Sequence, residues 1–511
     1  MLSRVKSCGL LGIDGYIVEI ETDIGNGIPA FDLVGLGDTA VRESKERVRS
    51  AIKNTGLEFP TKKIIVNLSP ADIRKEGSAF DLGIAIGILT CTGQILTNYI
   101  DNYLFAGELS LDGKLNPVGG ILSMAVCAKQ YGIENLIVPA ENAKEASVVK
   151  DINVLPAGSL AQIVEHINDK VKIYSCEQNL DELFSIDADY DLDFNDVKGQ
   201  ESAKRALEVA ASGGHNCLII GSPGSGKTML AKRQPTILPP LTFEEALEVT
   251  KIHSIAGTLP QNTSLITKRP FRSPHHTISP AGLVGGGKYP RPGEISLAHY
   301  GVLFLDEVPE FEKSALEVLR QPLEDESVTI SRLNCTLSYP ACTTLICTAN
   351  PCKCGNYLDT TRDCNCTPRQ VQQYLGRLSG PLLDRMDIHI EAPSVKYSDF
   401  EKEENAETSK EIRERVYKTR RTQLERYKEY NIYSNSQLTP LLIKKFCKLD
   451  ISAKLLLKDA FEKLGLSARA HNRILKVART IADMEGNESI EKHHIAEAIQ
   501  YRSLDRKVWG R

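Results

Sequence analysis

The sequence predicts a multidomain α/β protein that ends in an all-helical domain. Its 511 residues exceed what one hydrophobic core usually supports, so two or three domains are expected. Short apolar runs alternate with helical patterns through residues 1–175 and again through 196–398, which is typical of α/β domains. From residue 399 to 511 the periodicity is helical throughout, which predicts a helical C-terminal domain.

The bulk composition is that of an ordinary globular chain, with 41% hydrophobic and 25% charged residues. A net charge of −4 gives no whole-chain reason to bind nucleic acid or anionic membranes, so any DNA contact needs a local basic patch. No long apolar run or signal peptide is recognisable, which predicts a cytoplasmic protein without a membrane span. The 13 scattered cysteines do not indicate a secreted disulfide framework.

Periodicity places the main elements. In the N-terminal block, apolar runs at 64–68 and 136–139 predict strands, and the patterns at 39–53 and 81–89 predict helices. Residues 176–195 are acidic and poor in apolar runs, which is typical of a linker. Five amphipathic stretches in the C-terminal block predict helices at 409–430, 440–449, 453–464, 469–484 and 491–503.

A phosphate-binding loop is the most specific motif in the chain. The apolar strand 217–220 leads into GSPGSGKT and then into a helical stretch, which is the context of a P-loop. Its glycines allow backbone N–H groups to point at phosphate oxygens, with Lys227 neutralising the β- and γ-phosphates and Thr228 holding Mg²⁺. The predicted nucleotide-binding residues are Gly221, Ser222, Pro223, Gly224, Ser225, Gly226, Lys227 and Thr228.

Two further apolar strands end in residues suited to ATP hydrolysis. Strand 301–305 is followed by Asp306, expected beside the metal, and by Glu307, expected to polarise the attacking water. Strand 343–349 is followed by Asn350, which is placed to orient water or a γ-phosphate oxygen. Taken alone, such polar strand ends are usually ordinary turn residues. The P-loop upstream is what favours the catalytic interpretation.

Four cysteines follow directly after Asn350. Cys352, Cys354, Cys364 and Cys366 form a C-x-C-x9-C-x-C pattern, which suits a tetrahedral zinc site in a reducing compartment. The alternatives are four unligated thiols in a surface loop, or a redox pair. Because a bare loop has little use for four clustered reactive thiols, the pattern favours zinc.

Several longer motifs resemble one protein family. RPFRSPHH, LVGGG, RPGEISLA and DEVPEF, with FDLVGL and VNLSP in the N-terminal block, resemble the ComM/YifB family of bacterial magnesium-chelatase-like AAA+ ATPases. The resemblance implies a Lon-protease-like (ribosomal S5 domain 2-like) N-terminal domain, an AAA+ P-loop core and a helical lid. It also implies three features inside the core: an insert at 262–298, a hairpin before the first sensor at 327–341, and the Cys-rich loop at 352–366.

The resemblance assigns roles to two arginines as well. Arg385 in SGPLLDRMD resembles an arginine finger, which reaches the γ-phosphate bound by a neighbouring subunit. Arg469 in SAR resembles the second sensor at the start of a lid helix. Without the family match, local pairing on the surface is the better interpretation of both. A finger that acts between subunits implies a homo-oligomeric ring, expected to be a hexamer.

The resemblance also points to DNA. Residues 328–339 are typical of two short strands around a turn, and Arg332 falls where AAA+ ring helicases present a basic residue to DNA. Lys288 and Arg291 lie in a basic, glycine-jointed loop suited to tracking a phosphate backbone. ComM-type proteins are branch-migrating helicases that promote integration of transforming DNA. The resemblance therefore implies ATP and Mg²⁺ as cofactors, single-stranded or branched DNA as partner, and recombination proteins as further partners.

Two alternatives come from related proteins. True chelatase subunits use ATP to drive Mg²⁺ into a porphyrin, so a chelatase-like or chaperone-like remodelling ATPase that ignores DNA is a second interpretation. The N-terminal block also resembles the proteolytic domain of Lon, which needs a serine nucleophile and a lysine base. Matching the motifs puts Ala79 and Leu122 at those positions, with Ser78 one residue early. A scaffold is therefore expected, and not a protease.

Overall fold

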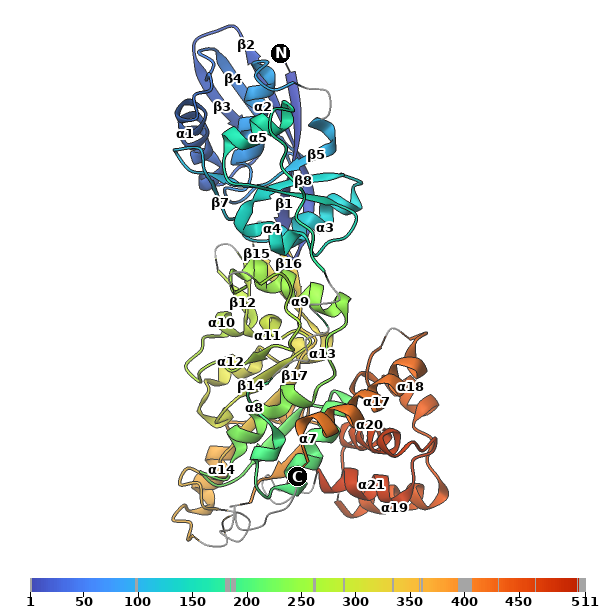
Figure 1. The fold of residues 1–511 in the computed structure, drawn as a ribbon. Helices are drawn as coiled ribbons and strands as arrows, with labels where there is room; N and C mark the ends of the chain where they lie inside the picture. Colours follow the sequence, from blue (N-terminus) through green and yellow to red (C-terminus); the bar gives the residue numbers. More distant parts are fainter. Residues whose placement is uncertain are drawn as a thin grey trace. The chain divides into compact units, whose positions relative to one another are not determined.

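The computed structural model divides into two compact units, Met1–Asp187 with Phe243–Thr267 and Ala188–Thr242 with Lys268–Arg511 (Figure 1). Each unit has its own sheet, and the second also contains the C-terminal helices. No helix in the described part is long and apolar enough to cross a membrane. The residues described are 2–96, 100–179, 184, 190–260, 263–287, 290–332, 335–357, 359, 362–393, 407–430, 432–464, 466–502 and 504.

The first unit is built on a seven-stranded mixed sheet with the order β3-β4-β2-β1-β5-β8-β9. β1 pairs antiparallel with β2 and parallel with β5, while β3 pairs parallel with β4, so the antiparallel pairs of this sheet are β4–β2 and β2–β1. Its strands are β1 (Leu2–Leu11), β2 (Asp14–Gly25), β3 (Ala30–Val34), β4 (Lys63–Ser69), β5 (Tyr103–Phe105), β8 (Asn135–Pro139) and β9 (Asn153–Ala157), with a small hairpin of β6 (Glu108–Leu109) and β7 (Leu115–Asn116).

Helices of this unit pack their apolar sides on the sheet. α2 (Asp81–Cys91) is buried along its whole length, because it lies in the core beneath β1 and β2. The strands expected at 64–68 and 136–139 and the helices expected at 39–53 and 81–89 all form. The other helices are α1 (Thr39–Asn54), α3 (Ile121–Gln130), α4 (Ala143–Ala146) and α5 (Leu160–Ile167), with the 3-10 turns η1 (Ile100–Asn102) and η2 (Ala140–Asn142).

One helix of the first unit comes from the second half of the chain. α9 (Phe243–Ala256) contacts α3, and its Ser254 joins a buried polar cluster. The Ser254 hydroxyl accepts from the Gly120 N–H at 2.9 Å and donates to Glu145 Oε1 at 2.5 Å. Desolvation raises the pKa of Glu145 above its usual value. The range 196–398, expected to be one continuous core, is therefore interrupted, because tertiary contacts group residues 243–267 with the first unit.

The second unit is built on a parallel five-stranded sheet with the order β11-β14-β17-β10-β18. β10 and β17 are buried at every residue, as expected of parallel strands covered on both faces. The expected insert 262–298 is only partly an insert, since β11 within it pairs with β14 at the sheet edge. The strands are β10 (Cys217–Ile220), β11 (Phe271–Arg272), β14 (Val302–Leu305), β17 (Thr344–Ala349) and β18 (Ile388–Glu391).

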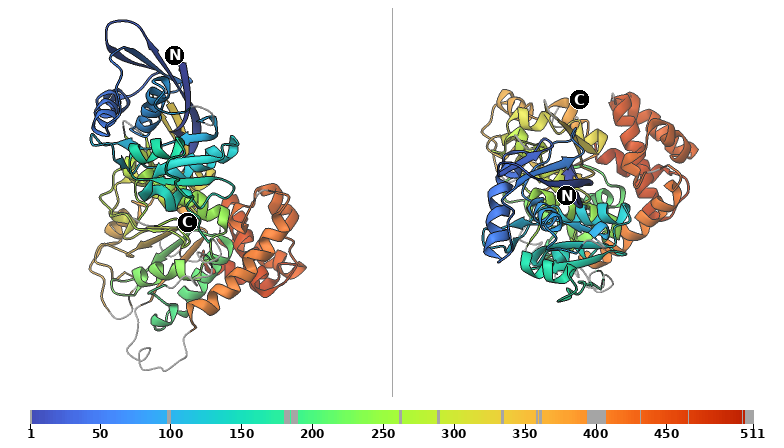
Figure 2. Two further views of the ribbon diagram at one scale, coloured as in Figure 1. Left: turned by 45° about the horizontal axis from the view of Figure 1, so that its top comes forward. Right: turned by 90° about the horizontal axis from the view of Figure 1, so that it is seen from above.

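Helices surround this sheet, and those after residue 408 gather to one side of it (Figure 2). Each of the five stretches predicted there contains a helix: α17 (Ser409–Tyr427), α18 (Pro440–Phe446), α19 (Ile451–Leu464), α20 (Ala468–Glu485) and α21 (Lys492–Gln500). They share one hydrophobic core with the sheet. The remaining helices are α7 (Glu201–Gly213), α8 (Lys227–Ile237), α10 (Pro280–Val284), α11 (Glu294–Leu297), α12 (Lys313–Glu317), α13 (Pro322–Asp325), α14 (Pro368–Leu375) and α15 (Gly380–Leu383), with the turn η5 (Asn435–Gln437).

The end of the expected linker 176–195 belongs to the second unit. Asp193 caps the 3-10 turn η3 (Phe194–Asp196), and the Phe194 ring is fully buried in the core. Arg233 of α8 donates to the Asp193 carbonyl at 2.5 Å and pairs with Asp196 at 2.7 Å. This is a correction of the linker boundary. The acidic composition suggested a solvent-exposed segment, whereas the Asp193 carbonyl and the Asp196 carboxylate both contact the buried Arg233, and the Asp193 carboxylate accepts from the Ser409 N–H at 3.0 Å.

Candidate functional site

The loop between β10 and α8 forms a cradle for an anion. Gly224 and Gly226 have φ values of 82° and 84°, a region that only glycine adopts at little cost. At Gly221 a Cβ atom would meet the Ala392 carbonyl oxygen at 2.3 Å, so the backbone approach also requires glycine. α8 begins at Lys227, so the N–H groups and the positive dipole end of this helix face the loop.

The Lys227 ammonium group is held at the mouth of the loop. Its Nζ donates to the carbonyls of Gly221 at 2.7 Å and Ser222 at 2.9 Å, and to Asn350 Oδ1 at 3.2 Å. Burial lowers the pKa of Lys227, and the nearby carboxylates of Asp306 and Glu307 oppose that shift. The ammonium, the loop and Asn350 therefore meet at one point.

A hydroxyl and a carboxylate meet beside this lysine. Thr228 Oγ1 donates to Asp306 Oδ2 at 2.9 Å, and the Thr348 hydroxyl donates to the other oxygen of Asp306. These oxygens are the ligand type that Mg²⁺ prefers. They come together because β10, β17 and β14 are parallel neighbours whose carboxyl ends share one sheet edge.

Glu307 begins the 3-10 turn η4 (Val308–Glu310) in an unusual conformation. Its φ of 51° and ψ of 50° lie in the left-handed region, which a non-glycine residue adopts only where the surroundings enforce it. The Glu307 N–H donates to the Thr348 hydroxyl at 3.0 Å, while the side chain is exposed. The carboxylate is therefore positioned by its backbone and remains accessible to water.

Sequence reasoning missed two residues of this site. The Thr348 hydroxyl hydrogen-bonds both the Asp306 carboxylate and the Glu307 backbone. It was detectable from the sequence in principle, because it lies two residues before Asn350 and residues two apart share a strand face. Gln200 has no such signal. It lies before α7, yet its side-chain amide donates to the Ser225 carbonyl of the P-loop at 3.0 Å.

The two arginines assigned by resemblance make their recorded contacts away from the P-loop. Arg385 donates to the carbonyls of Arg320 at 3.0 Å and Pro381 at 2.7 Å, and its Nη2 pairs with Glu324 Oε1 at 2.5 Å. Its side chain is 11% exposed and lines an open cavity of ≈ 470 Å³. Arg469 is 71% exposed and contacts Asp384, the residue before Arg385, at 3.4 Å.

Two hairpins lie side by side in the second unit. The expected hairpin 327–341 forms from β15 (Ser327–Arg332) and β16 (Cys335–Pro340). Beside it, β12 (Gly285–Gly286) pairs with β13 (Arg291–Pro292). The Tyr339 hydroxyl donates to the Pro290 carbonyl at 2.8 Å, which joins the two. Arg291 is exposed, whereas Lys288 and the side chain of Arg332 lie outside the described residues.

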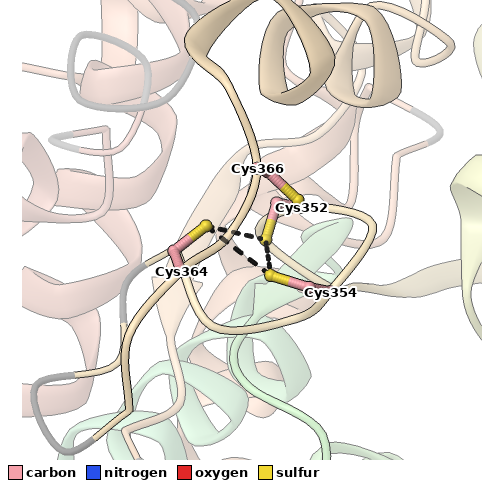
Figure 3. A group of neighbouring side chains, drawn as sticks. All are labelled: Cys352, Cys354, Cys364 and Cys366. Atoms are coloured by element: carbon pink, nitrogen blue, oxygen red, sulfur yellow. Dashed lines mark hydrogen bonds between the residues drawn. The ribbon is translucent and has the colours of Figure 1, made fainter.

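The four cysteines converge in the loop between β17 and α14 (Figure 3). Sulfur–sulfur distances are 3.3 Å for Cys352–Cys354, 3.7 Å for Cys352–Cys364 and 3.6 Å for Cys354–Cys364. All four sulfur atoms, including that of Cys366, lie within 4.8 Å of one another. The backbone N–H of Asn356 and the Cys352 thiol lower the pKa of Cys354 to about 6.

In the first unit, the positions matched to the Lon dyad carry no nucleophile or base. Ala79 is buried and Leu122 is fully buried in α3. The Ser78 hydroxyl hydrogen-bonds the Glu108 carboxylate, and the Leu122 N–H donates to Glu145 at 3.0 Å. The serine nearest to the expected nucleophile position thus has a carboxylate as its partner.

Comparison with known proteins agrees with this geometry. Three family descriptions match: "Magnesium chelatase, subunit ChlI" over 193–400, "Subunit ChlI of Mg-chelatase" over 20–142, and "Magnesium chelatase, subunit ChlI C-terminal" over 406–502. The P-loop lies beside the carboxyl ends of parallel strands, and together with these matches it places the chain in the magnesium-chelatase-like class of AAA+ proteins.

Full-length relatives narrow the class further. The chain is 43% identical over 507 residues to "Competence protein ComM" of Haemophilus influenzae, covering 99% of this chain and 98% of the relative. It is 43% identical over 511 residues to "Uncharacterized protein YifB" of Salmonella typhimurium, covering 99% and 98%. The chain belongs to the ComM/YifB family of magnesium-chelatase-like proteins. A partial match to "Lon protease" of Chloroflexus aurantiacus, 26% identical over 165 residues, covers 30% of this chain and 20% of that protein.

Proposed function

We propose that this chain is an ATP-driven, ring-forming AAA+ motor that acts on DNA as a branch-migration helicase. Its role would be in homologous recombination or in the integration of transforming DNA. The observation that supports the proposal is that Lys227, Thr228 and Asp306 lie together beside the P-loop. Arg385 and Arg469, in contrast, contact other residues. The biological role is proposed because a full-length relative is a competence protein of Haemophilus influenzae.

The proposed chemistry divides among the residues of one sheet edge. Lys227 would neutralise the phosphates, and Thr228 with Asp306 would hold Mg²⁺, which would supply charge stabilisation at the transferring phosphoryl group. Glu307 accepts the proton of the attacking water, and Asn350 orients that water against the γ-phosphate. Burial that weakens the hydration of Lys227 strengthens its attraction to phosphate. The cofactors are thus ATP with Mg²⁺, and we include a structural zinc ion held by the four cysteines.

Two arginines would complete the site of a neighbouring subunit. Arg385 belongs to the short segment 379–387 and contacts its Pro381 carbonyl, and Arg469 of α20 contacts Asp384 of the same segment, so both arginines contact one short piece of chain. Neither has a recorded contact with its own P-loop in the described residues. A guanidinium supplied by a neighbour adds charge only when the ring is assembled, which couples hydrolysis to the oligomer, expected to be a hexamer.

DNA contact is assigned to the paired hairpins. β15 ends at Arg332, which with Cys335 forms the last pair of the β15–β16 hairpin, and the exposed Arg291 begins β13 of the adjoining hairpin. In the sequence, Lys288 falls between β12 and β13. Arginine and lysine on narrow hairpins contact phosphates without reading sequence, as a motor that moves along DNA requires. For the first unit we infer a Lon-like fold without proteolytic activity, used for assembly or DNA binding.

The decisive assay measures ATP hydrolysis with and without single-stranded and branched DNA. We expect DNA to stimulate hydrolysis, and Arg332→Ala to abolish that stimulation while basal hydrolysis survives. Arg421→Ala is the matched control, because Arg421 is exposed on α17 and pairs with Glu425 one turn further along the same helix. A wild-type rate that no DNA changes would favour the alternative, a chelatase-like or chaperone-like remodelling ATPase.

A further inference from the structure

We propose that the zinc-loaded cysteine cluster fixes one wall of the nucleotide site, so that zinc occupancy sets the affinity for ATP. The wall comprises the described residues 351–357, 359 and 362–377, which follow β17 and include the four cysteines and α14. This inference rests on the ATP and zinc binding proposed above. It goes further because it states that bound zinc changes how tightly the P-loop binds ATP.

The positions of the sulfur atoms fit one zinc ion. A Zn–S bond of about 2.3 Å in a tetrahedron separates neighbouring sulfurs by about 3.8 Å. The three recorded distances, 3.3, 3.7 and 3.6 Å, are close to that value. A turn brings the first pair together: Gly355 has a φ of 85°, and its N–H donates to the Cys352 carbonyl at 3.0 Å. Four thiolates at this spacing repel one another unless a cation lies between them.

One end of the wall touches the P-loop. A Cβ atom at Gly355 would meet the ring of Pro223 at 2.3 Å from Cδ and 2.5 Å from Cγ. The glycine backbone therefore lies directly against the proline of the phosphate-binding loop. Because Gly355 follows Cys354 in the chain, a metal bound by that cysteine fixes the surface against which Pro223 packs.

The other end of the wall touches the segment after Glu307. Cys352 packs with Val371, Tyr374 and Leu375 of α14, and Cys364 and Cys366 pack against the same cluster. Directly after α14, Arg377 donates to the Pro309 carbonyl at 2.9 Å and to Glu310 at 3.3 Å. The cysteine cluster is thus joined to the η4 turn that Glu307 begins, as well as to the P-loop.

Loss of zinc would release both contacts together. The cluster has only a small hydrophobic core of its own, so the cross-link between residues 352 and 366 is what limits its conformations. A mobile wall leaves Pro223 and the η4 turn without their packing partner. A tenfold loss of affinity corresponds to about 1.4 kcal/mol, the size of a single lost packing or hydrogen-bond contribution, so a loss of at least about tenfold in ATP affinity is expected.

The first experiment measures bound metal and ATP affinity on the full chain. Wild type should contain one zinc per chain by plasma mass spectrometry and should bind a fluorescent ATP analogue. Cys364→Ser should lose the zinc and bind the analogue at least about tenfold more weakly. Cys176→Ser is the thiol control, since Cys176 lies in the first unit. His493→Ala controls for the group Glu485, His493 and His494, which could also hold a metal.

A second variant keeps the metal and removes only the contact. Gly355→Ala should retain zinc yet bind the analogue about tenfold more weakly, because its Cβ displaces Pro223. Gly486→Ala is matched to it, with a φ of 77° and nothing within 4 Å of the added atom, so it carries the strain without the contact. We expect it to bind like wild type.

The outcomes distinguish ATP binding, zinc binding and the coupling between them. If wild type does not bind the analogue, the proposed ATP binding is wrong, and if wild type contains no zinc, the proposed metal site is wrong. Zinc in wild type with unchanged affinity in Cys364→Ser and Gly355→Ala overturns the wall alone. Equal weakening by Gly355→Ala and Gly486→Ala overturns it too, since backbone strain then explains the effect.

Discussion

Replacing Thr348 by valine tests whether this hydroxyl organises the hydrolytic carboxylates. Valine keeps the branched shape and removes only the oxygen. That oxygen donates to the Asp306 carboxylate and accepts from the Glu307 N–H at 3.0 Å. Thr348 is fully buried, so no water takes its place without rearrangement.

The magnitude follows from the two hydrogen bonds. A bond to a charged group contributes about 1.5–3 kcal/mol, and a buried N–H left without a partner costs about 1–3 kcal/mol. At about 1.4 kcal/mol per factor of ten, losing the first bond in the transition state lowers kcat by about tenfold to a hundredfold. KM for ATP should change little, because the Thr348 hydroxyl has no recorded hydrogen bond, among the described residues, to the groups that bind the phosphates. Lys227 is held by the Gly221 and Ser222 carbonyls instead.

The assay is steady-state ATP hydrolysis compared with Thr344→Val. Thr344 is on the same face of β17, four residues earlier and at the opposite end of the strand from the nucleotide site. It receives the same chemical change. Wild-type kcat in Thr348→Val, or an equal fall in both variants, would refute the role of this hydroxyl.

Two further predictions concern the segment that carries Arg385. Lys227→Ala and Arg385→Ala should each be inactive in ATP hydrolysis. An equal mixture should recover about a quarter of wild-type activity, because random assembly gives about a quarter of the shared sites an intact lysine and an intact arginine. A mixture as inactive as its components contradicts a finger acting between subunits. The hydrogen bond from His215 at 3.1 Å, acting against desolvation, lowers the pKa of Asp387 from 3.8 to about 2. A carboxylate whose pKa is depressed in the folded state stabilises the fold at pH values above its pKa in the unfolded state. About 2 kcal/mol of folding free energy is therefore present above pH 4 and is lost as pH falls towards 2. Acid unfolding followed by circular dichroism should show wild type and Asp387→Asn converging over that range, and a gap that stays constant down to pH 2 contradicts the assignment.

Much of the nucleotide site was predictable because its residues occupy the ends of strands with strong local signals. GSPGSGKT follows a buried strand, and Asp306, Glu307 and Asn350 each follow an apolar run. Parallel pairing then brings these ends to one edge with little freedom. Thr348 was missed although it lies two residues before Asn350 and so shares its strand face, because a threonine inside a strand is common. Its contacts with Asp306 and Glu307 reveal its role.

The cysteine loop illustrates the same limit. Spacing predicted a cluster, and the recorded sulfur distances agree with one. Spacing carried no information on what the loop touches. The contact of Gly355 with Pro223 joins residues far apart in the chain, and nothing in the sequence around either residue indicates it.

By itself the sequence determined the two α/β blocks, the C-terminal helices, the P-loop and the polar strand ends, because period and glycine placement are local properties. Tertiary structure alone decided that α9 packs in the first unit, that Phe194 belongs to the core, and that Arg385 pairs with Glu324. These outcomes depend on which buried polar groups find partners once the chain is compact. A buried charge or N–H needs such a partner wherever the chain supplies it, and sequence distance places almost no constraint on where that is.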